Sequence, residues 1–171
     1  MKTLPVVLAL ACVAVVGCKR KLHWSETRAT QISAGGFTTA IPAGWREASE
    51  ATDDDMQKLV AQQPGAHILV KDDFDGATII VKSADTEPTA EPPCDEIANT
   101  VAKQEGATAT NIVKSKLEND GVCRWNYKKD DVEGEYWIRF HDKQLFAVMC
   151  FAKGTDAAAC DQIRTSARPG A

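Results

Sequence analysis

Residues 121–151, with the sequence GVCRWNYKKDDVEGEYWIRFHDKQLFAVMCF, decide the fold class because polar and apolar residues alternate along much of the segment. Cys123, Trp125 and Tyr127 would share one face of a strand, and the residues between them are polar. A period of two is typical of a half-buried β-strand. Residues 145–152 are apolar without interruption, which predicts a central strand covered on both faces.

The neighbouring segments extend this pattern into a sheet. Tyr136, Ile138 and Phe140 alternate with charged residues and with Trp137. Turn sequences separate the strands at Asn119-Asp120-Gly121, at His141-Asp142-Lys143 and at Asp75-Gly76. The other predicted strands are about 30–40, 67–71, 77–83 and 111–117. Gly35-Gly36 in the first of them suggests a bulge or a turn.

Three segments have the apolar spacing of amphipathic helices. They are a short helix that Asp53 or Asp54 caps and that ends at Pro64-Gly65, a helix from about Cys94 to Glu105, and a last helix that Thr155 or Asp156 caps and that ends before Pro169. Helices lie before, within and after the run of strands, so they can cover both faces of the sheet. The sequence therefore predicts an α+β fold in which helices cover a mostly antiparallel sheet.

One corner of the sequence is motif-like. Phe37-x-x-x-Ile41-Pro42-x-Gly44-Trp45 precedes a short helix, a hairpin, a helix, a meander of strands and a final helix. This arrangement resembles the PsbP-like superfamily over about residues 30–168. That group includes an extrinsic photosystem II protein and many bacterial envelope lipoproteins. The resemblance implies an α/β/α sandwich, and it brings no shared catalytic residues to carry over.

The amino terminus has the order of a secretory signal. Lys2 precedes an apolar run of 13 residues, Leu4–Val16, which is shorter than the roughly 20 residues that span a bilayer. Val15-Val16-Gly17-Cys18 resembles a bacterial lipobox, although that pattern usually has Leu where Val15 stands. The resemblance implies cleavage before Cys18 and acyl chains on its sulfur. The alternative is an ordinary signal peptide that is cut at a small residue.

The domain organisation follows from this interpretation. We predict a signal peptide over 1–17, a lipidated tether over 18–29 and a single domain over 30–168. Removing 17 of the 171 residues leaves 154, which suits one domain. Lys19, not Asp, follows Cys18, and by resemblance to Gram-negative sorting this favours the outer membrane. We therefore expect a cell-envelope protein that is anchored in the membrane through Cys18.

The number of cysteines agrees with an exported protein. Cys12 leaves with the signal peptide and Cys18 is lipidated, so four of the six cysteines remain for pairing. The expected chain path predicts the bonds Cys94–Cys123 and Cys150–Cys160. A catalytic thiol pair is the alternative, but the sequence contains no Cys-x-x-Cys motif.

Composition excludes one class of partner. The precursor has 20 Lys and Arg against 24 Asp and Glu, a net charge of −4. Removing Lys2 with the signal peptide leaves 19 against 24, or −5. Nucleic-acid-binding domains carry a basic patch or stripe, so we expect no nucleic-acid partner.

No catalytic, metal or cofactor motif stands out, and we expect no cofactor. His23, His67 and His141 lack the spacing of a helical metal pair. Asp72-Asp73-x-Asp75-Gly76 superficially resembles a calcium loop, but lysines stand at its first and last ligand positions. The contact candidates are Trp137 and Arg139, which share the polar face of their strand, and the acidic, proline-rich loop 84–93. For Trp137, cover by a helix is the alternative, and we interpret Trp45 as a core anchor.

Three functions are compatible with these features. The leading hypothesis is a non-enzymatic, lipid-anchored binding or scaffold module that contacts an envelope protein. The second is a carrier of a small amphiphilic or lipid-like molecule, which would need an apolar pocket of about 300 Å³ or more between sheet and helix. The third is a hydrolase with an unrecognised site.

Overall fold

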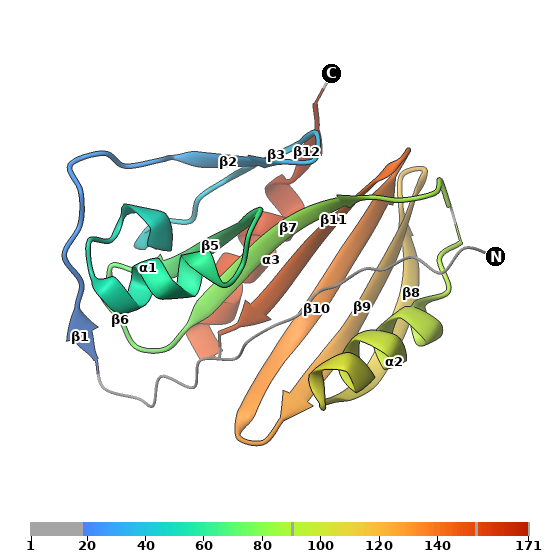
Figure 1. Cartoon of the computed structure of the whole chain (residues 1–171). Helices are drawn as coiled ribbons and strands as arrows, with labels where there is room; N and C mark the ends of the chain where they lie inside the picture. Colours follow the sequence, from blue (N-terminus) through green and yellow to red (C-terminus); the bar gives the residue numbers. More distant parts are fainter. Residues whose placement is uncertain (1–18, 90, 153, 171) are drawn as a thin grey trace.

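A seven-stranded antiparallel sheet forms the centre of the protein, in the order β4-β5-β7-β11-β10-β9-β8 (Figure 1). The structure is a computed structural model that describes residues 19–89, 91–152 and 154–170, so the predicted signal peptide and Cys18 lie outside the described residues. The strands are β4 (Trp45–Glu47), β5 (Ala66–Lys71), β7 (Thr78–Asp85), β8 (Thr108–Leu117), β9 (Asp120–Lys129), β10 (Val132–His141) and β11 (Gln144–Phe151). Strand β11 is the fourth of seven, which confirms its predicted central position.

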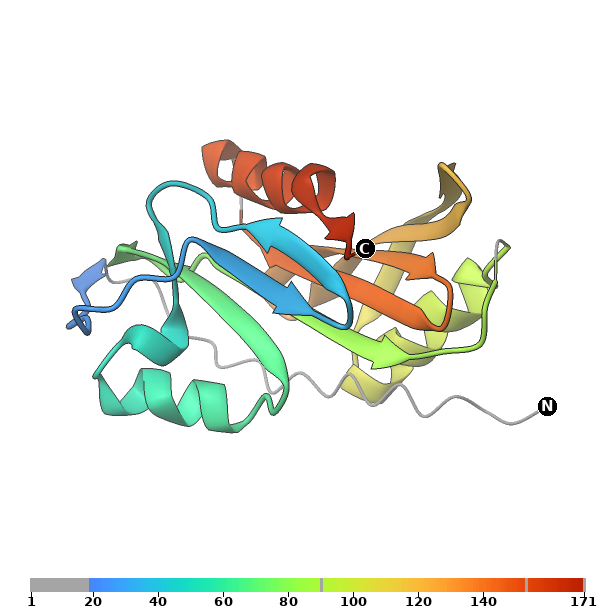
Figure 2. The same ribbon diagram turned by 90° about the horizontal axis from the view of Figure 1, so that it is seen from above.

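Helices and small sheets surround this centre. The helices are α1 (Asp54–Ala61), α2 (Cys94–Glu105) and α3 (Ala157–Ser166), with 3-10 turns at Ala48–Glu50 and Gly154–Asp156. A three-stranded sheet contains β2 (Gln31–Ala34), β3 (Phe37–Ala40) and β12 (Arg168–Pro169), and a two-stranded sheet pairs β1 (Arg20–Lys21) with β6 (Asp73–Phe74). Figure 2 shows α3 on one side of the large sheet, with α1 and α2 on the other. The α+β fold with helices on both faces is therefore confirmed.

The large sheet has a separate hydrophobic core on each face. The α1 and α2 face buries Met56, Trp125 and Tyr136. The α3 face buries Trp45, which is 4% exposed and is the core anchor that the sequence predicts, together with Ile163. Burying a large apolar side chain stabilises a fold by about 1.5–3 kcal/mol, so both faces contribute.

Strand β11 is apolar throughout because it supplies both cores. Ala147 and Met149 face α1 and α2, whereas Phe146 and Val148 face α3. All four side chains are almost completely buried. An uninterrupted apolar run therefore identifies a strand with a core on each side.

The predicted strand 30–40 is a hairpin, because of the two alternatives predicted at Gly35-Gly36, a bulge or a turn, the turn is the one that forms. Gly35 and Gly36 have φ values of +55° and +78°, a conformation that glycine adopts without a steric penalty. The chain reverses there, and β2 pairs antiparallel with β3. A Cβ atom on Gly35 would lie 2.4 Å from the Cβ of Ser83, so the turn packs closely against β7. This hairpin lies with α3 over one face of the sheet and adds a cover that the sequence did not predict.

The predicted cap residues Asp53 and Asp156 stand at the N-cap positions of their helices, but their side chains bond to other partners. Asp53 is the N-cap residue of α1, but it makes no capping hydrogen bond. It accepts hydrogen bonds from the backbone N–H of His23 at 2.8 Å and from the His23 ring at 3.2 Å. These bonds lower the pKa of Asp53 from its usual value. Asp156 likewise precedes α3 without capping it and accepts a hydrogen bond from Lys71 Nζ at 3.1 Å.

Part of the predicted tether belongs to the folded domain. Arg20 and Lys21 pair with β6 across an antiparallel ladder, and Leu22 is only 2% exposed within the core under α1. Trp24 forms a bridge with Ala51. The single apolar Leu22 between charged residues gave no periodic signal, so its burial could not be predicted locally. The described chain is thus docked from Arg20 onward, rather than from residue 30.

Candidate functional site

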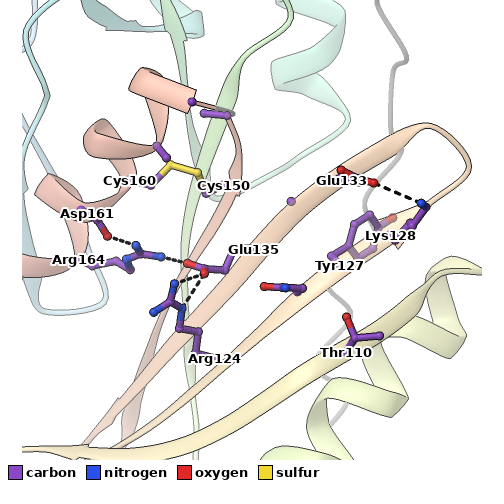
Figure 3. A pocket seen from close by; sticks show the side chains of 15 residues that line it. Thr110, Arg124, Tyr127, Lys128, Glu133, Glu135, Cys150, Cys160, Asp161 and Arg164 are labelled. Atoms are coloured by element: carbon purple, nitrogen blue, oxygen red, sulfur yellow. Dashed lines mark hydrogen bonds and ion pairs between the residues drawn. A yellow bond between two sulfur atoms is a disulfide. The ribbon is translucent and has the colours of Figure 1, made fainter.

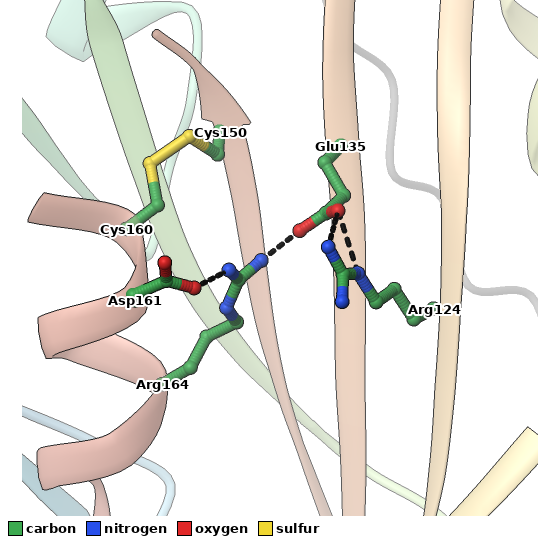
Figure 4. The surroundings of a disulfide bond; sticks show 6 residues. All are labelled: Arg124, Glu135, Cys150, Cys160, Asp161 and Arg164. Carbon is green, nitrogen blue, oxygen red and sulfur yellow. Dashed lines mark hydrogen bonds and ion pairs between the residues drawn. A yellow bond between two sulfur atoms is a disulfide. The ribbon is translucent and has the colours of Figure 1, made fainter. Parts of the chain in front are cut away.

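Two disulfides hold the sheet to its helices. Cys94 of α2 is bonded to Cys123 of β9, with Cα atoms 5.3 Å apart. Cys150 of β11 is bonded to Cys160 of α3, with Cα atoms 6.0 Å apart. Both bonds join the cysteines that the sequence predicts as partners. The second bond fixes α3 to β11 (Figure 4), and a groove lies beside this helix.

The groove lies where α3 leaves part of the sheet uncovered. Helix α3 packs on β11 and β3, and the neighbouring strands keep an open face around Thr110, Asn126 and Glu135. The groove between them has a volume of about 560 Å³ (Figure 3). Its charged lining side chains are Arg124, Lys128, Glu133, Glu135, Asp161 and Arg164.

Glu135 is the centre of the charge network in this groove. Its carboxylate accepts a hydrogen bond from Arg124 Nε at 2.6 Å and another from Arg164 Nη1. Arg164 also donates to Asp161. Figure 4 shows Glu135 between the two guanidinium groups. With the Lys128–Glu133 ion pair at 3.2 Å, the groove carries three positive and three negative side chains.

The two arginines differ strongly in exposure. The Arg164 side chain is 12% exposed, whereas that of Arg124 is 54% exposed. Burial lowers the pKa of the Arg164 guanidinium from its ordinary value, and the positive charge of Arg124 lowers it further. Arginine stays charged in proteins. Negative charge brought close to Arg164 is therefore favourable, and Asp161 and Glu135 now supply it.

The groove lining is rich in charged hydrogen-bonding groups. Its described lining has no histidine or serine, and its two cysteines are joined to each other. In the part of the chain that the structure describes, no group of three or more His, Cys, Asp or Glu side chains is placed to hold a metal ion. What the groove offers is charge-assisted hydrogen bonding, which fixes polar ligands with good geometry.

The predicted contact pair, Trp137 and Arg139, does not lie in this groove or on the surface. Trp137 is 8% exposed and packs edge-on against Phe146, with ring centroids 6.3 Å apart. Arg139 is 2% exposed and donates hydrogen bonds to Asp120 and to the backbone carbonyl of Ala167. The chain that follows α3 and the β2–β3 hairpin cover this end of the strand. The exposed-contact interpretation is therefore wrong for both residues, and for Trp137 the alternative of a covered, packed side chain is confirmed.

The three histidines are distributed over separate acidic partners. His23 meets Asp53, and His141 meets Asp120 with Nδ1 2.9 Å from the carboxylate. His67 places its two ring nitrogens 3.0 Å from Glu47 and 3.0 Å from the Ser33 carbonyl oxygen.

The Glu47–His67 pair shifts the pKa of both groups. The hydrogen bond to Glu47 raises the pKa of His67 despite burial. For Glu47, burial raises the pKa, but the hydrogen bond and charge of His67 outweigh it and the pKa is lowered. The pair thus joins β4 to β5, and the hydrogen bond from His67 to the Ser33 carbonyl connects β5 to the β2–β3 hairpin.

The two acidic segments have structural partners. Asp75 accepts hydrogen bonds from Lys71 Nζ at 2.7 Å and from the Ala77 amide at 3.1 Å, which agrees with the predicted hairpin turn. From the loop 84–93, Glu91 lies 3.6 Å from Lys116 of β8. Within residues 19–89, 91–152 and 154–170, none of the helices combines the length and the apolar character that crossing a bilayer requires.

Comparison with known proteins relates this geometry to one fold. The sequence matches no model of a protein family, and it matches no curated protein. Among solved structures, cyanobacterial PsbP (CyanoP) from Synechocystis sp. PCC 6803 aligns with a TM-score of 0.59 over 81% of this chain and 91% of that chain, at 12% identity. The fold is PsbP-like.

A second solved structure shares the PsbP-like fold over part of its length. It is a crystal structure from Bacteroides thetaiotaomicron VPI-5482, with a TM-score of 0.53 and 10% identity. The alignment covers 85% of this chain and 50% of that chain. At such identities the likeness concerns the fold alone, so the chemistry of the groove must be argued from the residues of this chain.

The sequence predicts two members of the groove network, Arg124 and Glu135, only as polar residues on the solvent side of their strands. The alternating pattern places Arg124 and Glu135 on the polar face of their strands. Nothing local shows that Arg164, on a helix that follows the last long strand, meets Glu135. The predicted Cys150–Cys160 bond was the available signal, since it brings the first turn of α3 to the sheet.

Proposed function

We propose that the protein is a lipid-anchored binding module of the bacterial cell envelope, without catalytic activity, and that the groove between α3 and strands β8–β10 is its ligand site. The observation that carries the proposal is an open groove of about 560 Å³ that is lined by three positive and three negative side chains. Ligand sites usually have volumes of about 300–1,000 Å³.

The lining favours a polar ligand or a polar segment of a partner protein. Arg124 is half exposed and keeps donors for an incoming acceptor, while Glu135 can accept from an incoming donor. A lipid-like cargo would need an apolar cavity, and this groove is walled by six charged side chains. The carrier hypothesis therefore receives no support from the groove.

The anchor would hold this site close to a membrane. The lipobox resemblance of Val15-Val16-Gly17-Cys18 supports acylation, and Lys19 after it supports outer-membrane sorting. Because Arg20 is docked on β6, only Lys19 would separate the acylated Cys18 from the folded domain. Arg20 forms an ion pair with Asp55, so it is already engaged by the domain rather than by lipid headgroups. We thus propose a short anchor rather than a long, flexible tether.

Site-specific photocrosslinking in the native membrane tests the ligand site. A photoreactive amino acid replaces Asn126, an exposed groove residue, and a matched variant carries it at Lys103, which is exposed on α2 across the sheet. We expect Asn126 to capture a distinct species that Lys103 does not. When the Asn126 crosslinking variant also carries Arg124→Glu, its crosslinked product should disappear. Identical products from both positions, or none from Asn126, would refute the groove as the site.

The anchor is tested separately by intact mass and fractionation. The purified native protein should begin at residue 18 with acyl chains attached, and a Cys18→Ser variant should leave the membrane fraction. An unmodified thiol at that position, or a different first residue, would contradict the anchor and leave the groove proposal standing.

A further inference from the structure

Strand β8 presents an unpaired edge. It is the last strand of the large sheet, and in the described part of the chain it pairs only with β9 (Figure 1). Its first half, through Ile112, packs against the core beneath α2. Its last five residues, 113–117, are all exposed. An exposed strand edge is a template for an added strand.

The side chains of this edge are sorted by face. Val113 lies opposite Arg124, so Val113 and Leu117 are on the groove side of the sheet. Lys114 lies opposite Cys123, so Lys114 and Lys116 are on the α2 side. Val113 is 51% exposed and Leu117 is 38% exposed. The edge therefore has Val113, Ser115 and Leu117 along one face and two lysines along the other.

The charges indicate the kind of strand that would fit. β8 has the sequence TATNIVKSKL, with two lysines and no acidic residue, in a chain of net charge −4. Directly opposed residues of paired strands share a face, and opposite charges there stabilise the pair. A matching strand would thus alternate apolar residues with acidic ones. Lys116 already meets Glu91 of the acidic loop at 3.6 Å, but both side chains are mostly exposed, so a partner can displace this weak contact.

A second copy of this chain fits the same edge poorly. Symmetric antiparallel pairing centred on Ser115 would place Lys114 opposite Lys116 on both sides of the axis. Like charges that face each other across a strand pair are destabilising. Lysines on an edge strand are a common means of preventing self-association.

We propose that residues 113–117 of β8 bind an extended, acidic segment of a partner polypeptide as an additional strand of the sheet. The acidic side chains lie along Lys114 and Lys116, and the apolar ones cover Val113 and Leu117. This surface is distinct from the groove and does not depend on it.

A charge-swap titration tests the proposal on the purified full chain. The probe is a labelled synthetic decapeptide that alternates valine with glutamate. Its binding is measured by fluorescence anisotropy and by the NMR shifts of the β8 amides. The double variant K114E/K116E should weaken binding by fivefold or more, since two attractive pairs become repulsive. The matched variant K58E/K103E makes the same charge change on α1 and α2 and should bind as the unmodified protein does.

Rescue distinguishes recognition from misfolding. A peptide with lysine in place of glutamate should bind K114E/K116E better than it binds the unmodified protein, and high salt should weaken both matched pairs. Equal loss in K58E/K103E, no rescue, or amide shifts outside β8 would overturn the proposal. So would a dimer of the unmodified protein that K114E/K116E disrupts, because a second copy would then cover the edge.

Discussion

Replacing Arg139 with methionine tests whether this residue stabilises the end of the sheet. Its side chain is 2% exposed and donates to Asp120, which is 8% exposed, and to the carbonyl of Ala167 at 3.4 Å. Methionine keeps an unbranched stem but removes the charge and every donor. Asp120 would retain its contact with His141 at 2.9 Å but lose its strongest counter-charge.

The expected loss is large relative to the stability of a domain. Removing one partner from a buried ion pair costs about 3–5 kcal/mol, because the other charge stays buried without compensation. Domains of this size are stable by about 5–15 kcal/mol. Urea unfolding followed by tryptophan fluorescence measures the loss, since Trp125 and Trp137 are buried and would report unfolding. The urea midpoint should fall while the m-value stays unchanged.

The double variant Arg139→Met/Asp120→Asn provides the control. It removes both charges, so its loss should be smaller than the sum of the losses of the two single variants. A loss below about 1 kcal/mol for Arg139→Met, or simple additivity in the double variant, would refute the buried ion pair as the source of stability.

Replacing Cys94 and Cys123 together by alanine should lower the free energy of unfolding by about 3.6 kcal/mol, the loop entropy expected for a separation of 29 residues. An unchanged urea midpoint would contradict this prediction. Gly134→Ala should destabilise by about 1–3 kcal/mol in the same assay, because a Cβ there would lie 2.6 Å from a backbone carbonyl of β11; a neutral effect would show that the strands can separate locally. The Glu47–His67 pair should stabilise most between about pH 4.3 and 6.5, the ordinary pKa values of the two groups. Its contribution is lost as pH rises through the raised pKa of His67 and as pH falls through the lowered pKa of Glu47. The stability deficit of Glu47→Gln should therefore shrink above neutral pH, and a deficit that stays constant with pH would count against the pair.

Local patterns were sufficient for the centre of the fold. The alternation around Trp125 and the uninterrupted apolar run of β11 identify half-buried and fully buried strands, because side chains of a strand alternate between faces. Gly106 at the end of α2 has φ of +66°, the conformation that its sequence position predicts. The disulfide pairs followed from the same local order, since tight turns fix where adjacent elements end.

Contacts between segments far apart in the sequence were decided by the tertiary structure alone. A single Leu22 between charged residues has no periodic signal, yet β1 docks on β6 because that side chain completes the core under α1. The polar pattern of β10 could not show that one end of the strand is covered, burying Arg139, while the other borders the groove at Glu135. The sequence by itself determined the three helices and the long strands of the large sheet. Which of their polar faces meet solvent depended on where α3 and the β2–β3 hairpin pack, and no periodicity within a single element encodes that.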